Sequence, residues 1–310
     1  MEEKPRKGKK KKSGGKRKKW STVDFIIIGV LVVILAVCIG KLIQIGLTYK
    51  AGTDEYKSLQ IYAEEIPESE EAAEEIGIPK LAIDYASLQE INSDFAVWLY
   101  IPLLDISYPV VQGVDNEIYL GQTFEKNNNI AGAIFLDFSN KKDFSDRHSI
   151  IYGHNMKNGS MFGKLKNFVR DEELCDTNPY FYLYTPEKAM KYRIVSYYIT
   201  NETSPAYTFI NSDEEYDDYY RMMISNSAYK CEEEIPEGAN IVTLSTCYGK
   251  PNGPQRFVVH GMLVETESAE DVTVETQSET VVVETETAGE DASEEETGDV
   301  QETESSSEAA

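Results

Sequence analysis

The chain has 310 residues, 41% of them hydrophobic, and carries four cysteines with 30 Lys+Arg against 54 Asp+Glu. This length allows one catalytic domain but excludes several large ones, and four cysteines are too few for a small disulfide-built scaffold. The net charge of -24 would repel phosphate over most of the chain, so we expect no nucleic-acid partner.

The N-terminal part predicts a membrane anchor. Residues 1–20 hold 11 Lys+Arg and two Asp+Glu, and residues 23–47 form an apolar run. A helix of this run would be about 37 Å long, enough to cross a bilayer with some tilt. A cleaved signal peptide is the alternative, but no small-x-small site follows the run. Because basic residues stay inside, we expect a cytoplasmic segment (1–22), a transmembrane helix (23–47) and an extracellular remainder.

Residues 48–80 are predicted to be an extracytoplasmic stalk. They contain EEIPESEEAAEEIGIP, a charged stretch with two prolines and room for one or two helical turns. The following IDYASLQEINSDFAVWLYI has apolar residues first at helical and then at alternate spacing, which predicts a short helix and a strand. The folded domain is therefore expected over residues 81–266.

Most of this domain is predicted to be β-structure. Its further strand candidates are rich in β-branched or aromatic residues and bounded by Gly, Pro, Asn or Asp; they are SYPVVQG, GAIFLD, SIIYGH, KYRIVSYYIT, NIVTLSTC and RFVVHGMLVE. So many short strands favour a closed or nearly closed β-barrel. Residues 212–230 instead begin with a capping signal at Ser212 and repeat Tyr216, Tyr219, Tyr220 and Met223 at helical spacing, which predicts a helix between two late strands, with its aromatic stripe in the core.

The C-terminal residues 267–310 are predicted to be a disordered acidic tail. Residues 265–310 hold 17 Asp+Glu and no Lys or Arg, and Glu, Thr and Ser dominate them. Such a composition cannot bury enough apolar surface to offset the entropy of ordering. We expect a solubilising extension rather than a specific binding segment.

Cys247 is the candidate nucleophile. It ends the apolar strand NIVTLSTC and precedes a loop rich in Gly and Pro. A thiol at the rim of a sheet can meet a substrate while the sheet fixes its position. A buried inert cysteine is the ordinary alternative. Alternation places Thr243, Ser245 and Cys247 on one face of the strand.

Two further residues favour the catalytic interpretation. The strand SIIY ends in the polar turn Gly153-His154-Asn155, which offers an imidazole, and Arg256 opens the next strand nine residues after Cys247. A hairpin would return Arg256 alongside the thiol, where its cation favours the attacking thiolate. A nucleophile, a proton carrier and a fixed cation are the parts needed for acyl transfer.

The other histidines and cysteines are weaker candidates than these residues. His260 shares the face of Arg256 by alternation and is a rival to His154, but it lies within a strand rather than at a strand-end turn. His148, beside Asp146 and Arg147, is expected to be a solvated loop residue. Cys175 and Cys231 flank no such turn and are expected to be structural thiols.

These residues together resemble the sortases, membrane-anchored cysteine transpeptidases of Gram-positive bacteria. The segment from Thr243 to Cys247 matches the family's TLxTC box, Gly153-His154-Asn155 its histidine turn and Arg256 its arginine. YGHNMKNGSMFG (152–163) and the helix between late strands are similar to class B, and the resemblance covers residues 83–264. It implies a sortase-type closed β-barrel with short helices and a class B helix insertion, preceded by one transmembrane helix.

The resemblance also implies a mechanism and partners. Cys247 would attack the threonyl carbonyl of an NPxTx-like sorting signal on a secreted protein, His154 would protonate the leaving amine, and Arg256 would steady substrate and oxyanion. An amine of a peptidoglycan precursor (lipid II-like) would then take the acyl group. Further positions similar to the class B substrate groove are Asn116, Leu120, Tyr152 and Ser245. No cofactor and no metal is implied, and the sequence shows no Cys/His ligand spacing.

Two other functions remain as alternatives. A pilin-polymerising sortase would transfer the acyl group to a pilin lysine, but the Asp-Pro-aromatic lid motif that often precedes the barrel in such enzymes is missing from this sequence. A membrane-tethered binding module with an inactive thiol would use the acidic tail to capture cationic partners. The combination of Cys247, His154 and Arg256 argues against the second alternative.

Overall fold

A computed structural model describes residues 20–66, 77–171, 173–229, 231, 236–250 and 253–268. Residues 1–19, most of the predicted basic cytoplasmic segment, lie outside the described residues. Residues 269–310, nearly all of the predicted acidic tail, also lie outside them.

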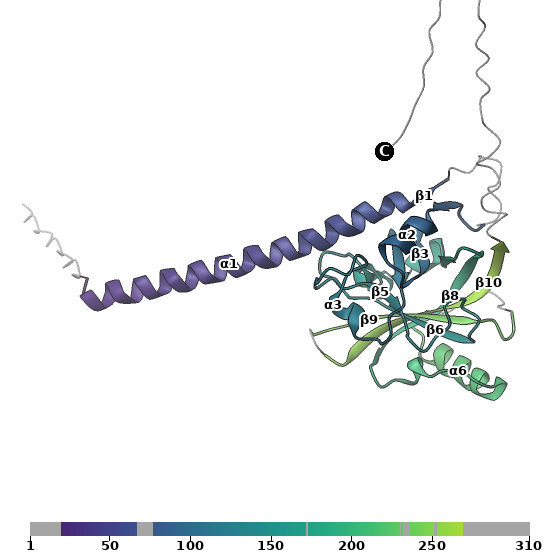
Figure 1. The fold of residues 1–310 in the computed structure, drawn as a ribbon. Helices are drawn as coiled ribbons and strands as arrows, with labels where there is room; N and C mark the ends of the chain where they lie inside the picture. Colours follow the sequence, from purple (N-terminus) through teal and green to yellow (C-terminus); the bar gives the residue numbers. More distant parts are fainter. Residues whose placement is uncertain are drawn as a thin grey trace, which may run out of the picture. The chain divides into compact units, whose positions relative to one another are not determined.

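The apolar N-terminal run forms one continuous helix, α1 (Thr22–Ser58), drawn in purple in Figure 1. Ser21 caps it: its side chain accepts a hydrogen bond from the Val23 amide, while the Asp24 carboxylate accepts one from the Ser21 amide. This capping box satisfies amides that would otherwise lack partners. By length and composition α1 is a candidate to cross a membrane.

The end of α1 and the residues after it pack against the main domain, which differs from the expected stalk with one or two helical turns. The chain continues from α1 into the 3-10 helix η1 (Leu59–Tyr62) and the strand β1 (Ala63–Glu65), which pairs with β2 (Leu81–Ile83). Tyr56, Leu59 and Ala63 are buried in the main hydrophobic core. These apolar residues pack against the barrel and are buried by it. The ordered domain therefore includes residues before Leu81, the expected start of the fold.

In the described part of the chain, eight strands close into a barrel in the order β10-β8-β7-β3-β4-β5-β6-β9, which confirms the predicted fold class (Figure 1). The strands are β3 (Phe95–Ile101), β4 (Ile106–Val111), β5 (Ile134–Leu136), β6 (His148–Tyr152), β7 (Tyr180–Tyr184), β8 (Lys188–Asn201), β9 (Ile241–Cys247) and β10 (Gln255–Ser268). Pairs β4–β5 and β6–β9 are parallel, and the others are antiparallel. Closure leaves the long strands without free edges.

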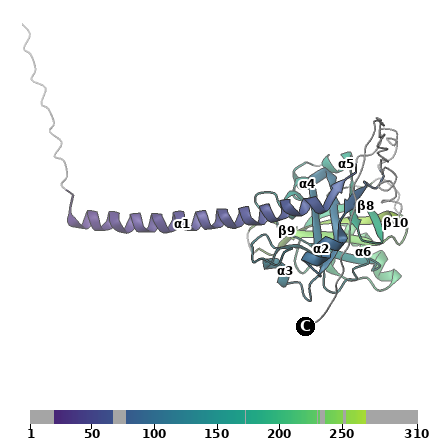
Figure 2. The ribbon, with the colours of Figure 1, turned by 45° about the horizontal axis from the view of Figure 1, so that its top comes forward.

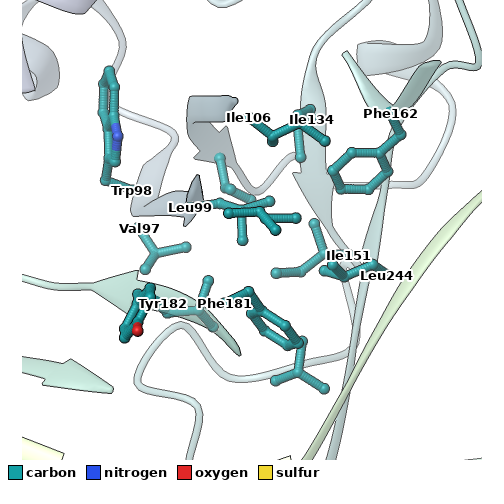
Figure 3. Packing of buried hydrophobic residues seen from close by; sticks show 14 of the residues in the cluster. Val97, Trp98, Leu99, Ile106, Ile134, Ile151, Phe162, Phe181, Tyr182 and Leu244 are labelled. Atoms are coloured by element: carbon teal, nitrogen blue, oxygen red, sulfur yellow. The ribbon is translucent and has the colours of Figure 1, made fainter. Parts of the chain in front are cut away.

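Most strands contribute at least one hydrophobic side chain to the barrel interior. Figure 3 shows Leu99, Ile106, Ile134, Ile151 and Phe181 lying together, and all are at most 1% exposed. Burying such side chains stabilises the fold by about 1.5–3 kcal/mol each. This core holds the ends of β6, β9 and β10 in fixed positions.

Short helices fill the connections between the strands. They are α2 (Tyr85–Ile91), η2 (Pro102–Leu104), α3 (Ile118–Gly121), η3 (Phe162–Lys164), α4 (Asn167–Arg170), α5 (Leu174–Thr177) and η4 (Pro205–Tyr207). The predicted helix followed by a strand is confirmed as α2 and β3. The strand β7, with the sequence YFYLY, was not among the candidates.

The predicted inserted helix is confirmed as α6 (Asp213–Ser225), between β8 and β9. The Ser212 side chain accepts a hydrogen bond from the Glu215 amide and caps it. Tyr216, Tyr219 and Met223 are buried, whereas Tyr220 is 38% exposed. These buried residues cluster with Val195 of β8, Ile241 of β9 and Met262 of β10, and α6 lies at the periphery of the barrel in Figures 1 and 2. The helix therefore covers the outer face of the late strands.

His148 corrects one expectation, because it is a buried strand residue rather than a solvated loop residue. Its Nδ1 lies 2.8 Å from the Thr208 carbonyl oxygen and its Nε2 lies 2.7 Å from Thr243 Oγ1. Thr243 Oγ1 lies 2.8 Å from His260 Nδ1, and His260 Nε2 is buried without a partner among the described residues. All these distances fit two neutral rings, in which each Nδ1–H donates and the Thr243 hydroxyl donates to His148 Nε2. The packing of α6 over β6 and β9 removed these rings from water.

These buried rings predict a loss of stability in mild acid. Burial lowers the pKa of His148 to about 4 and that of His260 well below its usual value. An unfolded histidine binds a proton near pH 6.5, so the unfolded state binds more protons than the native state below that pH. The free energy of unfolding should therefore fall by about 2 kcal/mol between pH 7 and pH 5 from His148 alone.

Urea unfolding of the full chain at pH 7, 6 and 5 measures this effect. Most carboxylates stay ionised over this range. The His148→Asn variant should show a shallower dependence of unfolding free energy on pH than the unmodified chain. Equal slopes for the two proteins would contradict a neutral buried His148.

Candidate active site

The hairpin from β9 to β10 brings Arg256 directly opposite Cys247. The two residues are partners in the antiparallel register, and the Tyr248 amide donates to the Gln255 carbonyl at 3.0 Å to close the hairpin. Directly opposed residues place their side chains on the same face of a sheet, with Cβ atoms about 4.5–5.5 Å apart. The guanidinium and the thiol therefore leave the sheet on the same side.

The parallel pair β6–β9 carries His154 to the other side of Cys247. Tyr152 pairs with Ser245, and His154 and Cys247 each lie two residues further on. Because side chains alternate along a strand, His154 and Cys247 continue this register on the same face. Arg256, Cys247 and His154 thus follow one another across three neighbouring chain segments.

Side chains extend the ladder between β6 and β9 past the last strand residues. The Gly153 amide donates to the Ser245 carbonyl at 3.1 Å. Thr246 Oγ1 donates to the Gly153 carbonyl at 2.7 Å, and Asn155 Nδ2 donates to the Cys247 carbonyl at 2.8 Å. Hydrogen bonds therefore flank both the imidazole and the thiol and hold their backbones together.

All seven residues named from the sequence line one pocket of about 350 Å³. Cys247 is exposed there, which excludes a sulfur sealed inside the core. Asn116, Leu120, Phe135, Tyr152, Gly153, His154, Glu202, Tyr207, Ser245, Thr246, Cys247 and Arg256 form its walls. The size suits a short extended peptide.

Arg256 is held in place by oxygen atoms around its guanidinium. Its Nη2 lies 2.8 Å from Glu202 Oε2, and its Nη1 donates to the carbonyls of Gly253 and Gln255 at 2.8 and 3.0 Å. Glu202 follows the last residue of β8, next to β10. These bonds fix a positive charge at the mouth of the pocket, close to the thiol.

The opposite wall is organised around Asp137. Its Oδ2 accepts hydrogen bonds from Asn116 Nδ2 at 2.7 Å and from the Tyr152 hydroxyl at 3.0 Å. Burial, followed by the charge of Asp137, raises the pKa of Tyr152, so its hydroxyl remains a donor. Asp137 thereby fixes two of the residues predicted to line the groove.

Tyr207 and Glu202 are pocket residues that the sequence did not identify. Tyr207 belongs to η4, and its hydroxyl lies 2.9 Å from Ser245 Oγ. Burial raises the pKa of Tyr207. Glu202 follows the end of β8 but has no nucleophile or imidazole beside it in the sequence to single it out, and Tyr207 lies in no motif; both reach the pocket through the path of the chain between β8 and α6.

His260, the rival to His154, lies away from the pocket. It pairs with Thr243, four residues before Cys247, so along the strand it lies about 13 Å from the Arg256–Cys247 pair. It is fully buried. His260 and Arg256 do share one face of β10, as alternation predicts. The imidazole that lines the pocket with Cys247 is nevertheless that of His154.

The imidazole of His154 has its own support. Its Nε2 lies 2.8 Å from the Leu120 carbonyl oxygen, which can only accept. This bond assigns the proton to Nε2 and leaves Nδ1 to exchange a proton with a substrate. The arrangement can perform acyl transfer: a thiol to attack, an imidazole to move a proton and a cation to stabilise negative charge. Within the described residues, no three His, Cys, Asp or Glu side chains gather as metal ligands would.

Known proteins share both the sequence and the fold. The Sortase domain family matches residues 99–264, more than half of the chain. Sortase B of Listeria monocytogenes is 32% identical over 182 residues, which cover 57% of this chain and 72% of that protein. The crystal structure of sortase B from Bacillus anthracis in complex with AAEK1 superposes with a TM-score of 0.58 at 30% identity, covering 71% of this chain and 99% of that one. For Clostridium perfringens sortase B the TM-score is 0.54 at 32% identity, with 58% and 99% covered.

Proposed function

Since the chain belongs to the sortase family of cysteine transpeptidases, we propose that it is a class B enzyme, held in the cell membrane by α1, that joins secreted proteins to the cell wall. Its substrates would be proteins with a C-terminal NPxTx-like sorting signal. Its acceptor would be an amine of a lipid II-like peptidoglycan precursor. The observation that carries the proposal is the single pocket that brings the exposed Cys247 together with His154 and Arg256.

The first half of the reaction forms an acyl-enzyme. The Cys247 thiolate attacks the threonyl carbonyl carbon, and the carbonyl oxygen takes up negative charge beside the Arg256 guanidinium. As the C–N bond breaks, His154 in its protonated form gives a proton to the leaving amine. The products are a thioester on Sγ, a neutral imidazole and the released C-terminal fragment.

The second half transfers the acyl group. An acceptor amine loses a proton to the neutral imidazole of His154 and attacks the thioester carbon, and Sγ leaves as thiolate. The new amide joins the substrate protein to the acceptor, and the enzyme regains its starting protonation state. Water in place of the amine would give hydrolysis.

The anchor explains how the enzyme would meet both substrates. With the basic residues before α1 on the cytoplasmic side, the barrel lies outside the membrane. Secreted proteins and a membrane-held precursor are both available there. This orientation is part of the proposal.

Trapping the acyl-enzyme tests the proposed function. The full chain in detergent is incubated with a small set of sorting-signal peptides and no added amine, and its mass is measured. We expect a mass increase equal to the peptide up to its threonine, on the proteolytic fragment that contains Cys247. Hydroxylamine should remove it, because it cleaves thioesters.

Other outcomes separate the alternatives. No adduct with any peptide between pH 6 and pH 8 would favour the binding module with an inactive thiol. A covalent ladder formed only when a pilin is supplied would favour pilin polymerisation. An adduct on a residue other than Cys247 would contradict the proposed nucleophile.

A further inference from the structure

The imidazole of His154 is held by residues 118–133, which follow β4. The Leu120 carbonyl accepts from its Nε2, and its ring lies against Gly132. A Cβ added to Gly132 would lie 2.9 Å from His154 Cδ2 and 2.6 Å from the Tyr119 carbonyl oxygen. Gly132 also has φ +56°, which glycine adopts without strain. The position of the imidazole therefore depends on where these residues lie.

Tyr56, in the last turns of α1, bonds this segment at two points, one near its middle and one near its end. Its hydroxyl donates to the Gly132 carbonyl at 2.7 Å and accepts from the Phe124 amide at 3.2 Å. The side chain is only 4% exposed. Burial raises the pKa of Tyr56 well above its ordinary value, so it stays a hydroxyl donor. Without this hydroxyl, the Gly132 carbonyl and the Phe124 amide would each lose a buried hydrogen-bond partner.

Glu55, the neighbouring residue of α1, bonds the turn after α3. Its carboxylate accepts from Thr123 Oγ1 at 2.8 Å, from the Glu125 amide at 3.0 Å and from Asn127 Nδ2 at 3.2 Å. These three residues lie three to seven positions after Leu120, whose carbonyl holds the imidazole. Two backbone positions support His154, the Leu120 carbonyl and Gly132. Tyr56 bonds Gly132 directly, and Glu55 bonds the turn that follows Leu120.

The same segment also packs closely on α1 one turn earlier. Asn129 Nδ2 donates to the Thr48 carbonyl at 3.0 Å. A Cβ at Gly52 would lie 3.0 Å from Asn129 Oδ1 and 3.2 Å from Ala131 Cβ. Residues 129–132 are therefore in contact with the anchor helix on one side and with His154 on the other.

We infer that the extra-membrane end of α1 is part of the active-site apparatus, with Glu55 and Tyr56 as positioning residues for His154. The inference rests on the proposed function and assigns α1 a second role besides anchoring. Its physical basis is that displacing a catalytic group by about 1 Å costs up to roughly 10²-fold in rate. The thiol and Arg256 lie on β9 and β10 and do not depend on this contact.

Point variants of the full chain in detergent test the inference. Tyr56→Phe and Glu55→Gln should each lower kcat about tenfold while KM changes less than about twofold, because Asn116, Tyr152 and Ser245 of the peptide-binding wall lie outside residues 118–133. The rate of Cys247 alkylation by iodoacetamide, followed by mass spectrometry against pH, should move to higher pH in both variants. An imidazolium farther from the sulfur stabilises the thiolate less.

Gln60→Ala is the matched control. Gln60 also joins this end of the chain to the barrel, but its Nε2 donates to the Ser107 carbonyl of β4 at 2.7 Å and to the Tyr56 backbone carbonyl at 3.3 Å, and neither acceptor belongs to residues 118–133. Its loss should lower the melting temperature and leave kcat and the alkylation profile unchanged. If Tyr56→Phe and Glu55→Gln behave like this control, the inference is overturned. If no sorting peptide reacts even with the unmodified chain, the proposed function fails, and the alkylation profile still decides the inference.

Discussion

Replacing Cys247 by alanine is expected to lower the rate of sorting-peptide cleavage by at least about 10⁴-fold, to background. Without the sulfur no thioester can form, and the remaining groups only bind and polarise the substrate. Because Cys247 is exposed, its truncation should change the unfolding free energy by less than about 0.5 kcal/mol. Peptide turnover and thermal unfolding, measured on the same sample, check both statements.

Cys38→Ala serves as the control for this variant. Cys38 lies on α1 within the predicted membrane span and is remote from the pocket in sequence and contacts. Its replacement should leave turnover unchanged. Unchanged turnover in Cys247→Ala would refute the proposed function, and loss in both variants would contradict a role specific to Cys247.

Replacing His154 by alanine is expected to lower kcat/KM about 10³-fold. Proton transfer by a positioned group contributes roughly 10²–10⁴ to rate, and the leaving amine departs poorly without it. The acylation step should be more affected with peptides than with activated esters, because an ester leaving group needs less protonation. Stopped-flow measurement of acylation with both substrate types tests this difference.

His260→Asn distinguishes the two candidate imidazoles. Its side-chain amide can replace the contact of His260 Nδ1 with Thr243 Oγ1, so the fold should survive with reduced stability. Activity per folded molecule should stay within a fewfold of the unmodified chain. Activity lost in His260→Asn but kept in His154→Ala would reverse the assignment of the acid/base.

The secondary structure of the domain could be read largely from local patterns. The strands β3, β4, β5, β6, β8, β9 and β10 and the inserted helix α6 were predicted from alternation, capping and turn residues, and the structure confirms them; β1, β2 and β7 were not predicted. The sequence YFYLY of β7 has no alternation of apolar and polar residues, since β7 is buried on both sides and four of its five residues are buried. A uniformly apolar and aromatic run has no periodicity that would distinguish a strand from a helix.

The chemistry of the site could also be predicted, since its residues sit at strand ends. Cys247, His154 and Arg256 lie where a strand meets a turn, and such ends gather at one rim of a barrel. Glu202 also follows a strand, but a carboxylate in so acidic a chain does not stand out, and Tyr207 lies in no strand-end motif. They reach the same pocket only because β8 is the neighbour of β10 and its following turn folds over β9.

The sequence by itself determined the apolar helix α1, the candidate nucleophile with its two candidate partners, and the strands that carry them, because each depends on neighbours a few residues away. Only the tertiary structure decided that His148 and His260 are buried under α6, and that residues 48–65 pack on the barrel instead of forming a free stalk. Both outcomes depend on contacts between segments about 60 to 100 residues apart. Such contacts exist only after strand register and barrel closure have brought the two surfaces together, and no local periodicity encodes them.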